Sequence, residues 1–184
     1  PAAEGASVAV GPRTVVLPGG DLLCSYMLTI SLTVNDFVPM LARSTDLGAT
    51  WDVQGPVWDH LKKEWSIFSS ISRDEEGHLK LFGVRWPIDV PGESFWSEAN
   101  HGMKQNDLIW ARSVDGGRTW TDPEVIPMPT TGAAEAPGAI CTTRGGRWLA
   151  PYAPYNTLDP NLRVERNQVI VMYSDDRGGS WNHS

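Results

Sequence analysis

Short alternating and apolar runs, separated by turns that contain glycine, recur along the whole chain. Residues 37–43, 107–112 and 168–173 alternate or remain apolar with a period of two, which predicts strands rather than helices. Pairs of apolar runs flank short turns at residues 13–17 and 22–28, 67–72 and 79–84, and 136–142 and 148–152. Such pairs are typical of β-hairpins. The pattern therefore predicts an all-β fold.

An eight-residue pattern, Ser-x-Asp-x-Gly-x-[Thr/Ser]-Trp, follows each of the three alternating runs. The three copies of this box begin at Ser44, Ser113 and Ser174, and their aspartates are 69 and 61 residues apart. Asp and Ser side chains can hydrogen-bond the backbone of a turn, and Gly supplies a positive φ. The Trp is a large apolar body that fits between neighbouring sheets. Each box is therefore predicted to be a hairpin turn with a structural role.

The spacing of the boxes predicts a β-propeller of four-stranded antiparallel blades with inserted loops. We expect blade one at about residues 12–58, blade two at about 66–127 and blade three at about 135–184, in a single partial domain. Only three residues follow Trp181, so the fourth strand of blade three is expected to be missing. Residues 7–10 are expected to form an extra strand before blade one.

Composition and charge limit the classes of partner that the protein is expected to bind. The chain has 184 residues, of which 41% are hydrophobic, and this suits a soluble globular protein. A net charge of -7 without any basic run argues against nucleic acid as a partner. The apolar runs are shorter than the roughly 20 residues that span a bilayer, so no membrane partner is expected. The start of the chain lacks the features of a signal peptide, and the compartment stays open.

Cysteine and histidine positions suggest no metal site or cofactor. Cys24 and Cys141 each lie in an apolar run, where a small buried thiol is the usual interpretation. The four histidines show no spacing typical of metal ligands. We therefore expect neither a metal nor another cofactor.

With these boxes the chain resembles the sialidase (neuraminidase) superfamily, whose BNR or Asp-box repeats lie between the third and fourth strands of each blade. The resemblance covers essentially the whole chain and implies about three blades, half of a six-bladed sialidase-like propeller. It also implies a catalytic face opposite the boxes. That face is formed by the connections between second and third strands and between fourth and first strands.

The resemblance implies two catalytic positions in blade one. Arg13 stands where the family places its first carboxylate-binding arginine, although the family's Arg-Ile-Pro motif is absent; the alternative is a surface arginine. Asp36 is the carboxylate of the connection that holds the family's general acid. The alternative for Asn35-Asp36 is a plain turn pair.

Further candidates for substrate binding lie on the same face. Glu135 begins blade three there, although the family's catalytic Glu comes from the following blade. The long connection of blade two could stack on sugars, or it could act as a lid that covers apolar surface. The loop of blade three carries residues that could hold an acidic sugar or could simply be solvated. The candidates in these two loops are Arg85, Trp86, Trp96, Tyr155 and Arg163.

Two classes of function fit these observations. The first is a glycosidase of exo-α-sialidase type that acts on acidic sugars of glycans. The second is a non-catalytic propeller that binds glycans or proteins, because a fold does not settle a function. The family's Tyr nucleophile, its Glu partner and two further arginines belong to later blades, so the chain alone is not expected to cleave a sialoside.

Three blades form an open arc with apolar flanks, which rarely remain in water. One interpretation is that the chain is a piece of a longer single-chain propeller. The other is a homodimer in which two copies, related by a two-fold axis, complete the ring. In that homodimer, residues 7–10 of one copy would complete blade three of the other.

Overall fold

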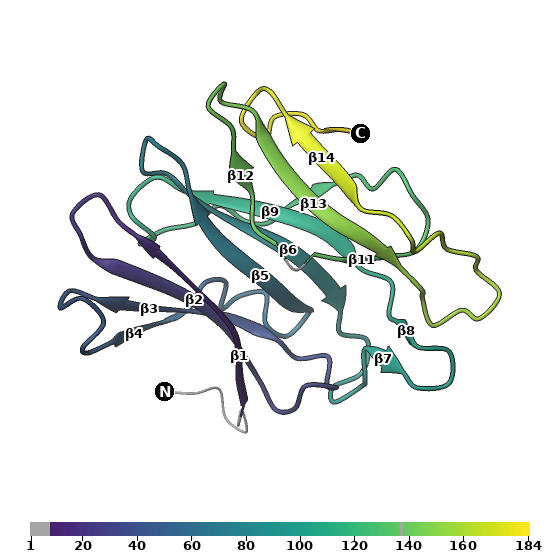
Figure 1. Cartoon of the computed structure of the whole chain (residues 1–184). Helices are drawn as coiled ribbons and strands as arrows, with labels where there is room; N and C mark the ends of the chain where they lie inside the picture. Colours follow the sequence, from purple (N-terminus) through teal and green to yellow (C-terminus); the bar gives the residue numbers. More distant parts are fainter. Residues whose placement is uncertain (1–7, 137) are drawn as a thin grey trace.

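In the computed structural model, which describes residues 8–136 and 138–184, every regular element is a β-strand (Figure 1). Blade one contains β1 (Val8–Val16), β2 (Leu22–Thr29), β3 (Val38–Ser44) and β4 (Asp52–Pro56). These strands pair antiparallel in that order. The all-β prediction and the four-stranded blade are confirmed.

Blade two has the same order of strands and a larger insertion. It contains β5 (Trp65–Arg73), β6 (Leu79–Pro87), β9 (Asp107–Ser113) and β10 (Glu124–Ile126). Between β6 and β9 the chain forms a small hairpin of β7 (Trp96–Ser97) and β8 (Gly102–Met103).

Blade three consists of β11 (Ala133–Glu135), β12 (Cys141–Thr142), β13 (Trp148–Tyr155), β14 (Ile170–Ser174) and β15 (Asn182–His183). Both β11 and β12 pair with β13, so the first strand is interrupted where the sequence predicted one run over 136–142. Gly138 in this run has no side chain to pack in a strand. The fourth strand is present as β15, although it has only two residues.

The expected extra strand before blade one is part of β1. Val8 pairs with Thr29 and Val10 pairs with Met27, so this segment belongs to the first hairpin. A bulge between Val10 and Arg13 contains Gly11 at a φ of 60° and separates the two halves of the strand. Ser7 lies outside the described residues. The strand exchange between two copies therefore loses its basis, because residues 8–10 already pair with β2 of the same chain.

Burial shows that the blades form an arc with blade two in the middle. Residues 79–84 of β6 are buried whichever face they point to. In contrast, β2 of blade one and β13 of blade three alternate strictly between buried and half-buried residues. Since side chains alternate between the faces of a strand, each end blade is covered on one face only.

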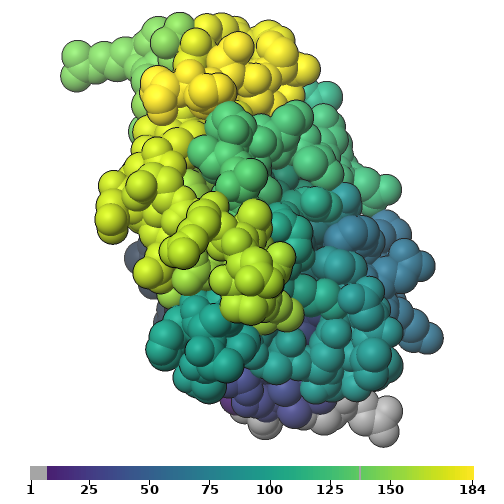
Figure 2. Space-filling view, turned by 90° about the vertical axis from the view of Figure 1, so that its right-hand side faces the viewer, coloured from purple at the N-terminus to yellow at the C-terminus, as the bar shows by residue number. Residues whose placement is uncertain are grey.

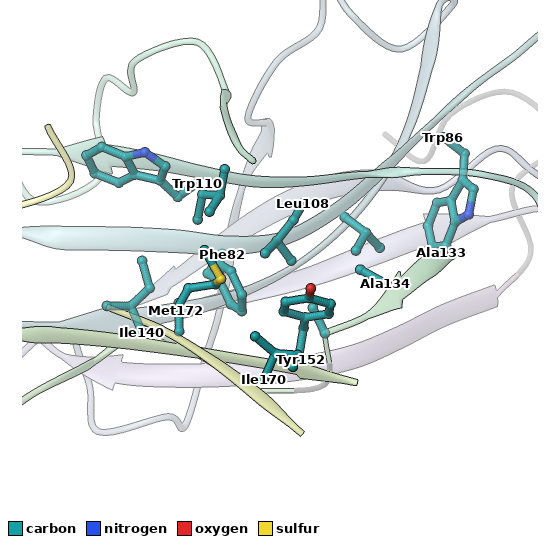
Figure 3. Packing of buried hydrophobic residues seen from close by; sticks show 14 of the residues in the cluster. Phe82, Trp86, Leu108, Trp110, Ala133, Ala134, Ile140, Tyr152, Ile170 and Met172 are labelled. Carbon is teal, nitrogen blue, oxygen red and sulfur yellow. The ribbon is translucent and has the colours of Figure 1, made fainter. Parts of the chain in front are cut away.

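Two apolar clusters join the blades. Phe82, Leu108 and Trp110 of blade two pack with Tyr152 and Met172 of blade three (Figure 3). The second cluster joins blades one and two and includes Leu23, Leu41, Ile67, Leu81 and Ile109. Each of these side chains contributes about 1.5–3 kcal/mol when fully buried, so the seams between blades hold the arc together.

The boxes form the predicted turns, which connect β3 to β4, β9 to β10 and β14 to β15. In the first box, Asp46 accepts hydrogen bonds from the Thr50 backbone N–H at 2.8 Å and from the Thr50 hydroxyl at 2.6 Å. Asp115 and Asp176 repeat these bonds with Thr119 and Ser180.

Neighbouring boxes lie at the same end of the arc. Arg43 donates a hydrogen bond across the seam to the Gly116 carbonyl of the second box at 2.6 Å. Gly178 of the third box approaches Trp110 of blade two so closely that a Cβ would lie 2.3 Å from the indole ring. The boxes therefore close the seams at this end.

The prediction that both cysteines are buried is wrong. Cys24 is half-buried because it lies on the uncovered face of β2, and Cys141 is exposed on the short strand β12; both are free thiols. In the described parts of the chain, no helix is long and apolar enough to cross a bilayer.

Candidate functional site

The ends of the strands that point away from the boxes form one face, the loop face. The connections at residues 30–37, 88–106 and 156–169 leave β2, β6 and β13 at this end. The first strands begin there too, because Val8 pairs with Thr29, Trp65 with Pro87 and Ala133 with Tyr155. The loop face therefore collects the connections that the sequence singled out.

Asp36 is fixed at the end of β2. Its carboxylate accepts hydrogen bonds from the buried hydroxyl of Thr29 and, at 3.1 Å, from the Ile30 backbone N–H. The residue is half-buried, so one side of the carboxylate remains accessible. The turn of blade one thereby presents Asp36 on the loop face.

An apolar cavity of about 240 Å³ lies next to Phe37, the residue that follows Asp36. Phe37 is buried, and the centroid of its ring lies 5.6 Å from those of Phe68 and Phe95. Those two rings form part of the cavity wall. The complete lining is Phe68, Val84, Trp86, Phe95, Met103, Ala134, Glu135 and Ala136.

Glu135 is the ionisable residue of this lining, and its position is set by a buried asparagine. Asn106 accepts a hydrogen bond from the Ala134 backbone N–H at 2.7 Å and donates one to the Ala134 carbonyl at 2.9 Å. Through these two bonds the Asn106 side chain pairs with the backbone of β11 as a neighbouring strand would. Glu135, which follows Ala134, is exposed at the cavity, so its carboxylate is available to a ligand.

Trp86 forms part of the cavity wall, and its indole N–H is buried. Only 5% of the residue is exposed, and its indole N–H has no hydrogen-bond partner among the described residues. Buried donors are normally paired. The wall is otherwise apolar apart from Glu135, and apolar walls with a few polar groups are typical of small-molecule sites.

The long connection of blade two, residues 88–106, crosses the loop face and is called the strap here. Its Glu93 accepts a hydrogen bond from the Asn35 amide at 2.9 Å. The same carboxylate forms an ion pair with Lys104 at 2.6 Å. Lys104 also pairs with Asp89 at 2.7 Å. Asn35 is completely buried, so the strap anchors the residue that precedes Asp36.

Charge pairing within the strap shifts two pKa values. Partial burial alone would raise the pKa of Glu93, but hydrogen bonds from Lys104 and Asn35 hold it below its ordinary value. Partial burial alone would lower the pKa of Lys104, but hydrogen bonds to Asp89 and Glu93 hold it above its ordinary value. Both groups therefore remain charged near neutral pH.

The strap also contacts the loop of blade three, as the teal and yellow-green segments of Figure 2 show. Met103 donates a backbone hydrogen bond to the Asn156 carbonyl at 2.9 Å, and the Asn100 amide donates to the Thr157 carbonyl at 3.0 Å. Gly102 allows this approach, since a Cβ there would lie 2.0 Å from the Thr157 carbonyl oxygen. The strap thus connects the loops of all three blades.

Neither Arg13 nor Arg85 is among the residues that line the apolar cavity. Arg13 is exposed in the middle of β1 opposite Ser25, which is four residues from Thr29 or roughly 13 Å along the strand. Arg85 donates to Asp107 at 2.9 Å and stacks on Trp65 at 4.0 Å. Its guanidinium therefore has a structural partner on each side.

The remaining candidates fall into two groups. Trp86 and Glu135 line the apolar cavity. Trp96 and Tyr155 instead contact each other across the seam, with ring centroids 5.8 Å apart. Arg163 lies in a second cavity on the loop of blade three.

Several residues that shape the site were missed in the sequence. Glu93 binds Asn35, 58 positions earlier, and Lys104, 11 positions later, and Asn106 reaches a strand 28 residues away. Phe37 was assigned only to a strand. The one available signal was the length of the strap, because long loops in compact domains usually have a task.

Solved structures with similar folds include sialidases. The chain matches the "Hadza microbial sialidase Hz136" with a TM-score of 0.72 and 21% identity, over 98% of this chain and 38% of that chain. A protein of unknown function from Dyadobacter fermentans matches with a TM-score of 0.72 and 17% identity, over 100% of this chain and 55% of that one. An α-L-arabinanase from Penicillium chrysogenum matches with a TM-score of 0.60 and 19% identity, over 98% and 50% of the two chains.

These likenesses show the fold, which is a sialidase-like β-propeller. The chain spans between 38% and 55% of the length of these three matched chains. No protein-family profile and no curated protein matches the sequence.

Proposed function

We propose that this chain forms part of a glycoside hydrolase of exo-α-sialidase type that acts on acidic sugars of glycans. The observation that carries the proposal is the apolar cavity next to Phe37, the residue that follows Asp36, with the Glu135 carboxylate in its lining. The cavity lies on the face opposite the boxes. Its position on a fold shared with sialidases and an arabinanase supports the proposal.

In this proposal Asp36 is the general acid. It donates its proton to the glycosidic oxygen while the bond from that oxygen to the sugar carbon breaks. Glu135 accepts a hydrogen bond from a sugar hydroxyl, and the apolar walls hold the less polar part of the sugar. The lining supplied by the described residues contains no tyrosine. The nucleophile therefore has to come from the part of the ring that these three blades do not supply.

The test is the hydrolysis of a fluorogenic sialoside by the closed ring, completed by further blades that supply the nucleophile. We expect Asp36→Asn to lower kcat about 100-fold or more with little change in KM. Asp52→Asn on the exposed strand β4 is the matched control and should leave kcat unchanged. If Asp36→Asn leaves kcat unchanged as well, Asp36 is not the acid.

A non-catalytic propeller that binds glycans is the second candidate. It is favoured by the positions of Arg13 and Arg85, since neither guanidinium lines the apolar cavity. Calorimetry distinguishes the candidates: saturable binding of a sialoside that persists in Asp36→Asn, without turnover by the closed ring, supports binding alone.

A further inference from the structure

A second cavity lies on the loop face, away from Asp36. Its volume is about 270 Å³, and it shares no lining residue with the apolar cavity. The strap of blade two contributes Asn100, and the loop of blade three contributes the rest. The lining is Asn100, Asn156, Asp159, Pro160, Leu162, Arg163, Val164 and Arg166.

The guanidinium groups of this cavity have no carboxylate partner among the described residues. Arg163 and Arg166 are exposed, and within the described ranges neither forms an ion pair with a carboxylate. The carboxylates of the same loop are held by their own turns: Asp159 accepts the Asn161 backbone N–H at 2.9 Å, and Glu165 accepts that of Asn167 at 3.0 Å. The cavity therefore offers two free cations in a protein with a net charge of -7.

Arg166 is partly oriented by an aromatic pair. Its guanidinium carbon lies 6.0 Å from the ring centroid of Tyr155, which itself contacts Trp96. This distance is at the outer limit of a cation–π contact. Such a contact uses the face of the guanidinium and leaves its N–H groups free to bind a carboxylate.

We propose that this second cavity binds a sugar unit that carries a carboxylate. Arg163 and Arg166 hold the carboxylate, while Asp159 and the Asn156 amide bind hydroxyl groups of the ring. Asp159 disfavours a multiply charged phosphate but accepts hydroxyl donors, which is why an acidic sugar fits better than a phosphate. The cavity is smaller than the roughly 300–1,000 Å³ of sites for drug-sized ligands, so one sugar ring is the appropriate occupant.

The proposal shares its ligand class with the proposed function but does not depend on catalysis or on Asp36. Its test is calorimetry of the 184-residue chain with methyl glycosides of N-acetylneuraminic acid, galacturonic acid and galactose, together with inorganic phosphate. We expect the acidic glycosides to bind at least about ten times more tightly than the galactoside and phosphate. We also expect binding to weaken as salt is added.

The variant that tests the cavity is Arg163→Ala with Arg166→Ala, which we expect to weaken binding of the acidic glycosides at least tenfold. Arg144→Ala removes an exposed arginine outside the cavity and should leave binding unchanged. Thermal melting verifies that both proteins fold. Glu135→Gln changes the other cavity, so it identifies any part of the measured binding that arises there.

Two results overturn the proposal. One is equal affinity for the acidic and neutral glycosides, or no saturable binding of the acidic ones. The other is binding that is lost in Glu135→Gln and retained in the double arginine variant, which places the ligand in the apolar cavity and leaves the proposed function intact. Conversely, a closed ring that binds acidic sugars here but shows no turnover contradicts only the proposed function.

Discussion

At the residue scale, the aspartates of the boxes show how one side chain organises a turn. Hydrogen bonds from Thr50, Thr119 and Ser180 lower the pKa of Asp46, Asp115 and Asp176 from 3.8 to about 2. These bonds are made by the charged carboxylates in the folded state. The stability of these turns therefore depends on the pH of the solution.

We expect the protein to lose stability as the pH falls from about 4 to 2. A carboxylate whose pKa is lowered on folding contributes stability that is complete above the unfolded pKa of 3.8 and is lost as the pH falls through the folded pKa of about 2. Melting temperatures measured by circular dichroism between pH 6 and 2 check this. Asp46→Asn should have a lower melting temperature at pH 6 and a shallower decline, and parallel curves for both proteins would contradict the explanation.

Leu47 is a second residue whose local conformation has a measurable effect. It has a φ of 59° and is 88% exposed, while the equivalent position of the second box is Gly116 at a φ of 73°. Side chains other than Gly are disfavoured there by about 1 kcal/mol or more. Leu47→Gly should therefore raise the free energy of unfolding by up to about 1 kcal/mol in urea denaturation. Gly116→Leu is the reciprocal variant and should lower it.

At the scale of elements, the strap determines how the loop face is built. The strands follow from a period of two and from local turn chemistry, and both can be read in the sequence. The long connection itself was visible in the sequence, but its contacts could not be predicted because they join distant positions, such as Asn35 with Glu93, 58 residues apart. Asp36 was located by resemblance, whereas the apolar cavity depends on Phe37, Phe68 and Phe95 meeting in space.

Gly102→Ala should separate the strap from blade three. The new Cβ would lie 2.0 Å from the backbone oxygen of Thr157, which cannot move without disturbing the loop. We expect a loss of about 2 kcal/mol or more in the free energy of unfolding. Gly19→Ala is the control, since a Cβ there meets no atom within 4 Å. Equal stability of the two variants would show that the strap does not stabilise the arc.

At the scale of the whole molecule, the two end blades each present a half-buried apolar face. On β2 this face contains Leu22, Cys24, Tyr26 and Leu28. On β13 it contains Leu149, Pro151, Ala153 and Tyr155. Such faces require a cover, and we propose that a second copy of the chain related by a two-fold axis supplies it where no further blades are present.

The 184-residue chain should therefore self-associate into a dimer at micromolar concentration, as light scattering can show. Tyr26→Lys, which places a charge on the uncovered face of β2, should shift the dimer toward the monomer. Val125→Lys changes a residue of β10 that is 47% exposed and serves as the control. A stable monomer of the unaltered chain at tens of micromolar would rule out the two-copy ring.

Blade two is buried between its neighbours on both faces, and this has a consequence for how the molecule opens. In a repeat protein each repeat is stabilised by its interfaces with adjacent repeats. A middle repeat has two such interfaces and is therefore stabilised most. Amide protons of β6 and β9 should therefore exchange with deuterium only when the whole arc unfolds, whereas those of β4 and β15 exchange by local fraying. Because the strap attaches the loop face to blade two, the loop face then keeps its shape while the outer strands β4 and β15 fray.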